Sequence, residues 1–171
     1  MMALNELGHK CIALVVDDSP ESLWMVSAAL EQSGITVLVA TDGAKAIELT
    51  HRVEPDVILM DAMMPGMSGF ETCRALKSGP RPLMTPIIFM TGLTENEYIV
   101  EGLASGGVDY ITKPVVVEVL IARLSTHIIN SRLLQSAREA LDTSGRSVLA
   151  FDPEGAFLWG SQRAFEVLSF I

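Results

Sequence analysis

The strongest constraint on the fold of this chain is a repeat in which short apolar runs alternate with longer amphipathic stretches. The apolar runs have the length of β-strands and occupy residues 11–16, 35–40, 57–60, 87–90 and 110–112. Apart from Thr36 and Thr112, these runs are continuously apolar instead of alternating, which is typical of strands that are covered on both faces. The repeat therefore predicts an α/β fold with a doubly wound, five-stranded parallel sheet.

Signals for helices lie between the apolar runs. Ser19 and Asp42 are N-cap candidates for the first two helices, and Pro20 stands at the first helical position of the first one. Residues 70–76 predict a third helix and residues 94–104 a fourth, with Thr94, Glu95 and Glu97 suited to its N-terminus.

A fifth helical stretch runs from about residue 115 to 141 without Pro or Gly. It is longer than the mean helix of about 11 residues, so we expect it to extend beyond the domain. Spacings of four and three predict a coiled-coil seam formed by Leu120, Leu124, His127, Ser131, Leu134, Arg138 and Leu141. The alternative is a helix that packs against a following domain.

Residues 146–171 predict a short β-hairpin around the turn Asp152-Pro-Glu-Gly, followed by a short helix capped by Ser161. So few residues do not bury a core alone, and they read as the start of a larger module. We expect a domain over residues 1–127, an extended signalling helix over 128–145 and a second, truncated module over 146–171.

Composition excludes several classes of function. The net charge of −9 argues against a nucleic-acid-binding surface in this chain. Cys11 and Cys73 have no partner at metal-ligand spacing, so we expect reduced core thiols. No segment is apolar enough for a signal peptide or a membrane span, and we expect a soluble cytoplasmic protein.

Polar residues follow the predicted strands at their carboxyl ends, where open parallel sheets bind ligands. Asp17 and Asp18 follow the first strand, Asp61 the third, Thr91 the fourth and Lys113 the fifth. Each alone has an ordinary role as a cap, turn or surface residue. Together, the carboxylates would repel one another unless a cation such as Mg²⁺ lay among them. The ammonium and hydroxyl groups suit the oxygens of a phosphoryl group.

Four motifs carry a family resemblance: "VVDDSP", "DVILMDAMMPGMSGF", "FMTG" and "DYITKP". Over about residues 11–127, the chain resembles the receiver domain of bacterial two-component response regulators. The resemblance implies a flavodoxin-like sheet with strand order 2-1-3-4-5. It also implies a signalling role in which the domain assists its own phosphorylation and dephosphorylation but is not a separate enzyme.

The resemblance implies a role for each site residue. Asp61 would be the phosphoacceptor, taking a phosphoryl group from a sensor histidine kinase. Asp18, Asp61 and the backbone carbonyl of Met63 would bind Mg²⁺ directly, and Asp17 would bind it through water. Lys113 would pair with the phosphoryl group.

Two residues would report phosphorylation. Thr91 would be the switch hydroxyl, and Tyr110 would turn inward with it; the alternative for Tyr110 is an ordinary half-buried tyrosine of an edge strand. The family also implies a cis peptide before Pro114. Gly92, which follows Thr91, would leave access to the phosphoryl group.

The extension leads to expectations about output. We expect a homodimer through the fifth helix and no membrane association. Residues 140–168 resemble the start of a PAS-type sensory module, and response regulators with this layout often end in a DNA-binding domain that regulates transcription. The alternative is a phosphorelay receiver without DNA-binding output. A haloacid-dehalogenase-type phosphatase needs a second Asp where this chain has Met63.

Overall fold

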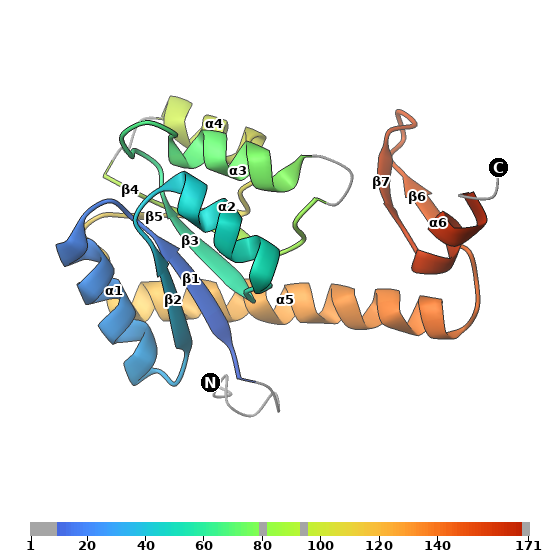
Figure 1. Cartoon of the computed structure of the whole chain (residues 1–171), viewed down its shortest axis with the longest axis horizontal. Helices are drawn as coiled ribbons and strands as arrows, with labels where there is room; N and C mark the ends of the chain where they lie inside the picture. The colour runs from blue at the N-terminus through green and yellow to red at the C-terminus, as the bar shows by residue number, and fades with distance from the viewer. Residues whose placement is uncertain (1–9, 79–81, 93–95, 169–171) are drawn as a thin grey trace. The chain divides into compact units, whose positions relative to one another are not determined.

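A five-stranded parallel sheet forms the centre of the first part of the chain (Figure 1). The computed structural model describes residues 10–78, 82–92 and 96–168. The strands are β1 (Ile12–Val16), β2 (Thr36–Ala40), β3 (Val57–Asp61), β4 (Ile87–Thr91) and β5 (Asp109–Thr112). They lie in the order β2-β1-β3-β4-β5, and all neighbouring pairs are parallel. The predicted fold class and strand order are confirmed.

Helices cover both faces of this sheet. They are α1 (Pro20–Gln32), α2 (Gly43–Arg52), α3 (Gly69–Lys77), α4 (Asn96–Ala104) and α5 (Val117–Thr143). The predicted caps are confirmed, because the Ser19 side chain accepts a hydrogen bond from the Ser22 N–H and the Asp42 side chain accepts one from the Lys45 N–H. The predicted N-terminus of α4 at Thr94 and Glu95 lies outside the described residues.

The core has two layers because successive strand residues point to opposite faces. On β1, Ala13 and Val15 pack with apolar residues of α1 and α5, whereas Leu14 and Val16 pack with those of α2 and α3. Burial on both faces explains why the central strands β1, β3 and β4 are almost continuously apolar, whereas the edge strands β2 and β5 are only partly buried. The arrangement places the carboxyl ends of β1, β3, β4 and β5 along one edge of the sheet.

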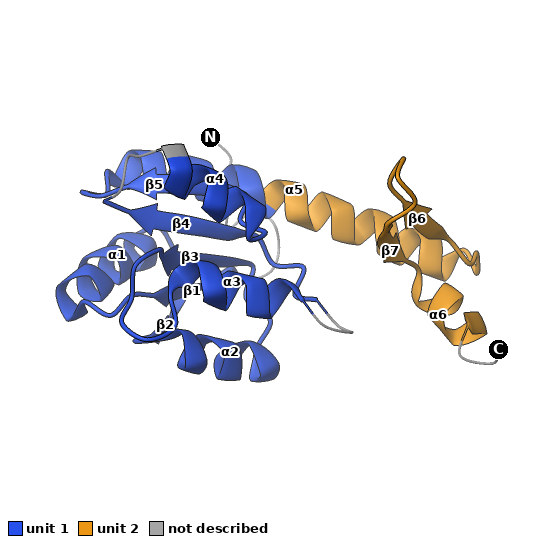
Figure 2. Ribbon diagram, turned by 90° about the horizontal axis from the view of Figure 1, so that it is seen from above, with its two compact units in different colours: residues 1–128 blue, residues 129–171 orange. Residues whose placement is uncertain are grey.

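The chain divides into two compact units, residues 1–128 and 129–171, and α5 passes from one to the other (Figure 2). The second unit contains an antiparallel hairpin of β6 (Leu149–Phe151) and β7 (Phe157–Gly160), followed by α6 (Gln162–Leu168). The predicted hairpin is therefore confirmed. None of the helices in the described ranges combines the length and apolar character that a bilayer crossing requires.

The predicted coiled-coil seam is wrong in the first part of α5. Leu120 and Leu124 are fully buried with Ile128 in the core of the first unit. His127 Nε2 lies 3.0 Å from Asp109 Oδ2 on β5. A core-facing helix stripe and a heptad seam share spacings of three and four residues, so the spacing alone did not distinguish them.

Candidate functional site

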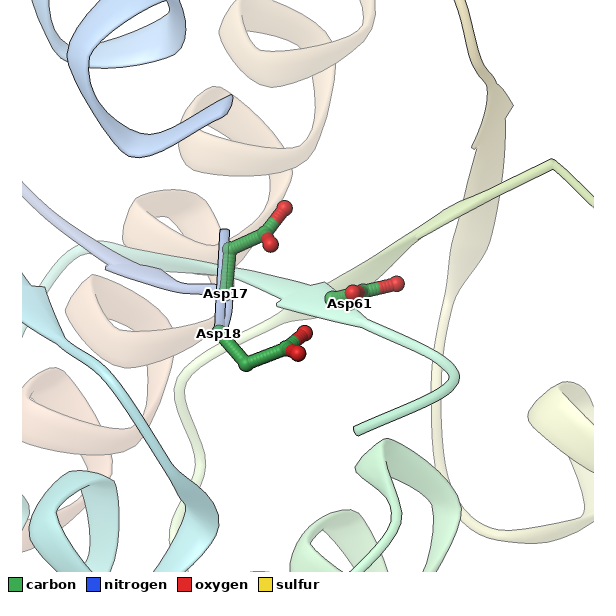
Figure 3. Close-up of side chains that lie close together, drawn as sticks. All are labelled: Asp17, Asp18 and Asp61. Atoms are coloured by element: carbon green, nitrogen blue, oxygen red, sulfur yellow. The ribbon is translucent and has the colours of Figure 1, made fainter. Parts of the chain in front are cut away.

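Three carboxylates meet where β1 and β3 end (Figure 3). Asp61 is the last residue of β3, and Asp17 and Asp18 follow β1 directly. Each contributes an oxygen that lies within 4.8 Å of the others. Asp17 and Asp61 are buried, whereas Asp18 is exposed. These carboxylates therefore lie together at the carboxyl ends of the strands, as the sequence predicted.

Asp17 is held by three donors at the start of α1 and the end of β5. Its side chain accepts hydrogen bonds from the Ser19 N–H at 2.9 Å, the Ser22 hydroxyl at 2.6 Å and Lys113 Nζ at 2.9 Å. Burial raises the pKa of Asp17, but the bonds from Lys113, Ser22 and Ser19 outweigh it, and the net pKa is lowered. Asp17 is therefore an anion in a fixed orientation.

Lys113 brings a positive charge to the cluster from the end of β5. Its Nζ lies 2.9 Å from Asp17 Oδ2 and 3.5 Å from Asp61 Oδ2. Burial lowers the pKa of Lys113, but its two carboxylate neighbours more than compensate, and the net pKa is raised. The peptide bond before Pro114 is cis, which confirms that prediction.

Asp61 is the carboxylate with the most unfavourable surroundings. Burial raises its pKa from 3.8 to about 6; Lys113 opposes this shift and the charge of Asp17 adds to it. The Met63 N–H donates a weak hydrogen bond of 3.4 Å to Asp61 Oδ1. One ammonium group leaves the negative charge of the cluster incompletely balanced.

Thr91 and Tyr110 occupy neighbouring strands beside this cluster. Thr91, the last residue of β4, is 5% exposed, and its carbonyl accepts a hydrogen bond of 2.8 Å from the Lys113 N–H. Thr91 and Tyr110 line one small cavity together with Phe89 of β4 and Tyr98 of α4. Thr91 and Tyr110 therefore border the same space.

Two residues that contribute to the site were missed in the sequence. The Ser22 hydroxyl donates a hydrogen bond to Asp17 from the first turn of α1. In the sequence, this contact was indicated only by the N-cap candidate Ser19, which places Ser22 in the first turn of the helix. Gly69 lies so close to β3 that a Cβ there would stand 2.1 Å from the Asp61 carbonyl oxygen. The start of α3 thus packs directly on the backbone of Asp61.

The donor set fits a hard divalent cation. Carboxylate oxygens are the ligands that Mg²⁺ prefers, and it retains waters that an open site accommodates. Asp18 is exposed and Met63 has 54% of its surface exposed, so the cluster is open to solvent on one side. A cation here would offset the burial and the Asp17 charge that raise the pKa of Asp61.

Comparisons with known proteins agree with this geometry. The model of the response regulator receiver domain matches residues 13–125. A probable cyclic di-GMP phosphodiesterase of Vibrio cholerae is 34% identical over 145 residues, which are 83% of this chain and 32% of that protein. The DNA-binding dual master transcriptional regulator RpaA of Synechocystis is 32% identical over 141 residues, 82% of this chain and 58% of RpaA.

A solved structure extends the likeness to three dimensions. The chemotaxis protein CheY4 of Vibrio cholerae has 35% sequence identity and a TM-score of 0.66, over 69% of this chain and 98% of CheY4. The chain therefore spans less than two thirds of the two longer relatives, and its match to CheY4 covers nearly all of that chain. With the sheet order and the acidic cluster, these matches show that the chain belongs to the response regulator receiver domain family, whose members are phosphoacceptors of two-component signalling.

Proposed function

We propose that Asp61 is the phosphoacceptor and that a sensor histidine kinase is its donor. An Asp61 carboxylate oxygen attacks the phosphorus of a phosphohistidine, the P–N bond breaks, and its electron pair leaves with the imidazole. The supporting observation is the position of Asp61 at the end of β3, with Lys113 Nζ 3.5 Å from its Oδ2. Lys113 can therefore contact the oxygens of the transferred group.

The residues proposed to hold Mg²⁺ are Asp18, Asp61 and the backbone carbonyl of Met63, with Asp17 acting through water. When bound, the ion supplies positive charge that offsets the phosphoryl oxygens and the carboxylates. Asp17 contributes by staying ionised, and the donors from Ser19 and Ser22 keep its orientation fixed.

Thr91 and Tyr110 are the proposed switch. Phosphorylation replaces the single negative charge of the ionised Asp61 carboxylate with a phosphoryl group of about −1.5 to −2 charge, and its three terminal oxygens draw the Thr91 hydroxyl toward Asp61. This leaves room for Tyr110 in the cavity that the two residues share. The face formed by α4, β5 and α5 then changes shape.

The direct test is labelling with acetyl phosphate, followed by intact-mass spectrometry. The full chain with Mg²⁺ should gain one phosphoryl group, and Asp61→Asn should gain none because the amide is a poor nucleophile. Removal of Mg²⁺ with a chelator should also stop labelling.

Asp56→Asn is the matched control, since Asp56 lies at the opposite end of β3 and binds the Ile12 N–H. It should label like the unmodified chain. Persistent labelling of the Asp61→Asn variant would place the acceptor elsewhere.

The proposed output is a change in a homodimer formed through α5. In place of the seam predicted from the sequence, this dimer would use the solvent-facing side of α5. Exposed residues at spacings of three and four form this side: Val119, Ala122, Thr126, Ile129, Leu133, Ser136 and Ala140. A hollow of about 250 Å³ at its start is lined by Tyr110, Val119 and Arg123, among others, which links the proposed switch to the proposed interface.

The role of the whole protein is also a proposal. The similarity to RpaA, which is named a DNA-binding transcriptional regulator, supports the proposal that the whole protein regulates transcription through a domain outside this chain. The relative named a phosphodiesterase favours an enzymatic output as a second candidate. The second unit as the start of a PAS-type module remains a prediction, because the family match ends at residue 125. A phosphorelay receiver without DNA-binding output is the alternative.

A further inference from the structure

Tyr98 and Tyr110 are the two tyrosines of this chain, and they line the same small cavity. Tyr98 lies in the first turn of α4, and Tyr110 lies on β5. Both are partly buried, and both pack against the core cluster that contains Phe70 and Phe89. Tyr110 also lines the larger hollow of about 250 Å³ beside the start of α5. It therefore borders both an inner and an outer space.

The inner cavity is too small to accept a phenol ring. Its volume is about 10 Å³, which is roughly the room that one water molecule needs. The inward turn of Tyr110, which rests on the proposed function, therefore requires that other atoms leave. A movement of Thr91 vacates only the space of a hydroxyl and a methyl group. A further side chain that lines the cavity must move as well.

Several groups that line the cavity are held in place. Phe70 and Phe89 are 4% and 2% exposed, and their ring centroids lie 5.0 Å apart. The backbone of Gly102 and Gly107 lies against the ring of Phe89, because a Cβ at these residues would stand 3.0 Å and 2.4 Å from it. Asp109 is held by an ion pair to α5. Phe89 therefore cannot move unless the backbone of α4 moves with it.

Among the other side chains that line the cavity, Tyr98 matches what Tyr110 requires. Leu103 is 49% exposed, so its departure would vacate little of the interior. Ile99 is β-branched, and one χ1 rotamer dominates for such a residue in a helix. Tyr98 has a ring of the same size as that of Tyr110, and its partial exposure gives the ring a path to solvent. An exchange of the two rings keeps the interior filled, as close packing demands.

We propose that Tyr98 is a positioning residue of the switch, whose ring occupies the space that Tyr110 takes after phosphorylation. Before phosphorylation, Tyr98 packs inward and keeps Tyr110 beside the outer hollow. When Thr91 moves toward Asp61, Tyr110 turns inward and the ring of Tyr98 moves onto the surface of α4. The face formed by α4, β5 and α5 thus loses one aromatic ring and gains another, so a single event changes this face at two places.

Fluorine NMR of the full chain with fluorotyrosine at both tyrosines tests the exchange, because it gives one signal for each ring. Tyr98→Phe and Tyr110→Phe assign the two signals. Beryllofluoride with Mg²⁺ stands in for the phosphoryl group, and a soluble paramagnetic agent broadens the signal of an exposed ring. On addition of beryllofluoride, the broadening of Tyr110 should fall by about twofold or more, and that of Tyr98 should rise by a similar factor.

Variants of α4 separate the exchange from a general loosening of the helix. Tyr98→Ala vacates the inner space, so Tyr110 should be shielded even without beryllofluoride. Tyr98→Phe keeps the ring, so the shielding of Tyr110 should still depend on beryllofluoride. Leu103→Ala is the matched control, because it shortens a half-exposed side chain of the same cavity, and it should behave like the unmodified chain.

The outcomes distinguish the exchange from the proposed function. If Tyr110 becomes shielded while the Tyr98 signal stays unchanged, the exchange is wrong and the proposed switch stands. Without beryllofluoride, equal exposure of Tyr110 in Tyr98→Ala and in the unmodified chain would also overturn the exchange. If neither ring responds although acetyl phosphate labels Asp61 in the same samples, the switch and the exchange both fail and the proposed acceptor stands.

Discussion

At the scale of single residues, Asp61 is a carboxylate whose ionised form is unfavourable in the folded protein. Its carboxylate is buried beside Asp17, and its pKa is raised to about 6. The folded chain therefore binds a proton at Asp61 more tightly than the unfolded chain does. For this residue, the stability of the metal-free protein falls as the pH rises from 3.8 through about 6.

We expect Asp61→Asn to stabilise the metal-free protein at high pH. Near pH 8 the free energy of unfolding should rise by about 1 to 3 kcal/mol, because the amide has no charge to bury. Near pH 4 the gain should largely vanish, since Asp61 is then protonated. Urea denaturation with a chelator measures both values. Asp18→Asn, at the exposed carboxylate, should gain less, and an equal gain by Asp61→Asn at both pH values would contradict the assigned pKa.

Sequence reasoning worked best for residues at strand ends. The carboxyl ends of parallel strands lie at one edge of the sheet, so polar residues that follow the strands in the sequence are predicted to lie near one another. This reasoning selected five residues: Asp17, Asp18, Asp61, Thr91 and Lys113. Gly69 was missed because its contact with the Asp61 backbone depends on how closely α3 packs on β3. No local pattern encodes that distance.

At the scale of elements, α5 has two roles on opposite sides. One side buries Leu120, Leu124 and Ile128 in the first unit, and the other carries exposed Ile129 and Leu133. The length of the helix was evident from the sequence because it lacks Pro and Gly. The sequence did not show which side of α5 packs on the core and which side faces solvent, because both sides repeat apolar residues at similar spacing.

Two leucines of α5 should respond differently to substitution. Leu124→Ala should lower the free energy of unfolding of the first unit by about 2 to 5 kcal/mol, because a fully buried side chain is lost. Leu133→Asp, at a residue that is 65% exposed, should leave that value nearly unchanged and weaken the proposed dimer. Chemical denaturation and sedimentation equilibrium, with and without beryllofluoride, measure the two effects. A dimer unaffected by Leu133→Asp would exclude this side of α5.

At the scale of the whole molecule, the proposed phosphoacceptor site belongs entirely to the first compact unit. The acidic cluster, Lys113 and both proposed switch residues all lie within residues 1–128. The second unit contributes the hairpin and α6, whose aromatic residues pack on one another, as Phe157 does between Phe151 and Phe165.

A chain shortened to residues 1–128 should keep the acceptor chemistry. It retains every buried residue of the sheet and its covering helices, so acetyl phosphate should label it at a rate within about twofold of the full chain. Self-association should be lost with the exposed part of α5. Mass spectrometry and light scattering measure these outcomes, and loss of labelling in a folded fragment would mean that the second unit takes part in phosphoryl transfer.

The close approach of Gly69 to Asp61 limits how this sequence can diverge. Even a single methyl group at residue 69 would push on the carbonyl of the proposed acceptor, whereas a Cβ at Gly92 would meet no atom of the described part of the chain within 4 Å. Random mutagenesis with selection for signalling should therefore leave residue 69 unchanged while residue 92 accumulates small side chains. Two glycines that look alike in the sequence thus differ in their evolutionary freedom.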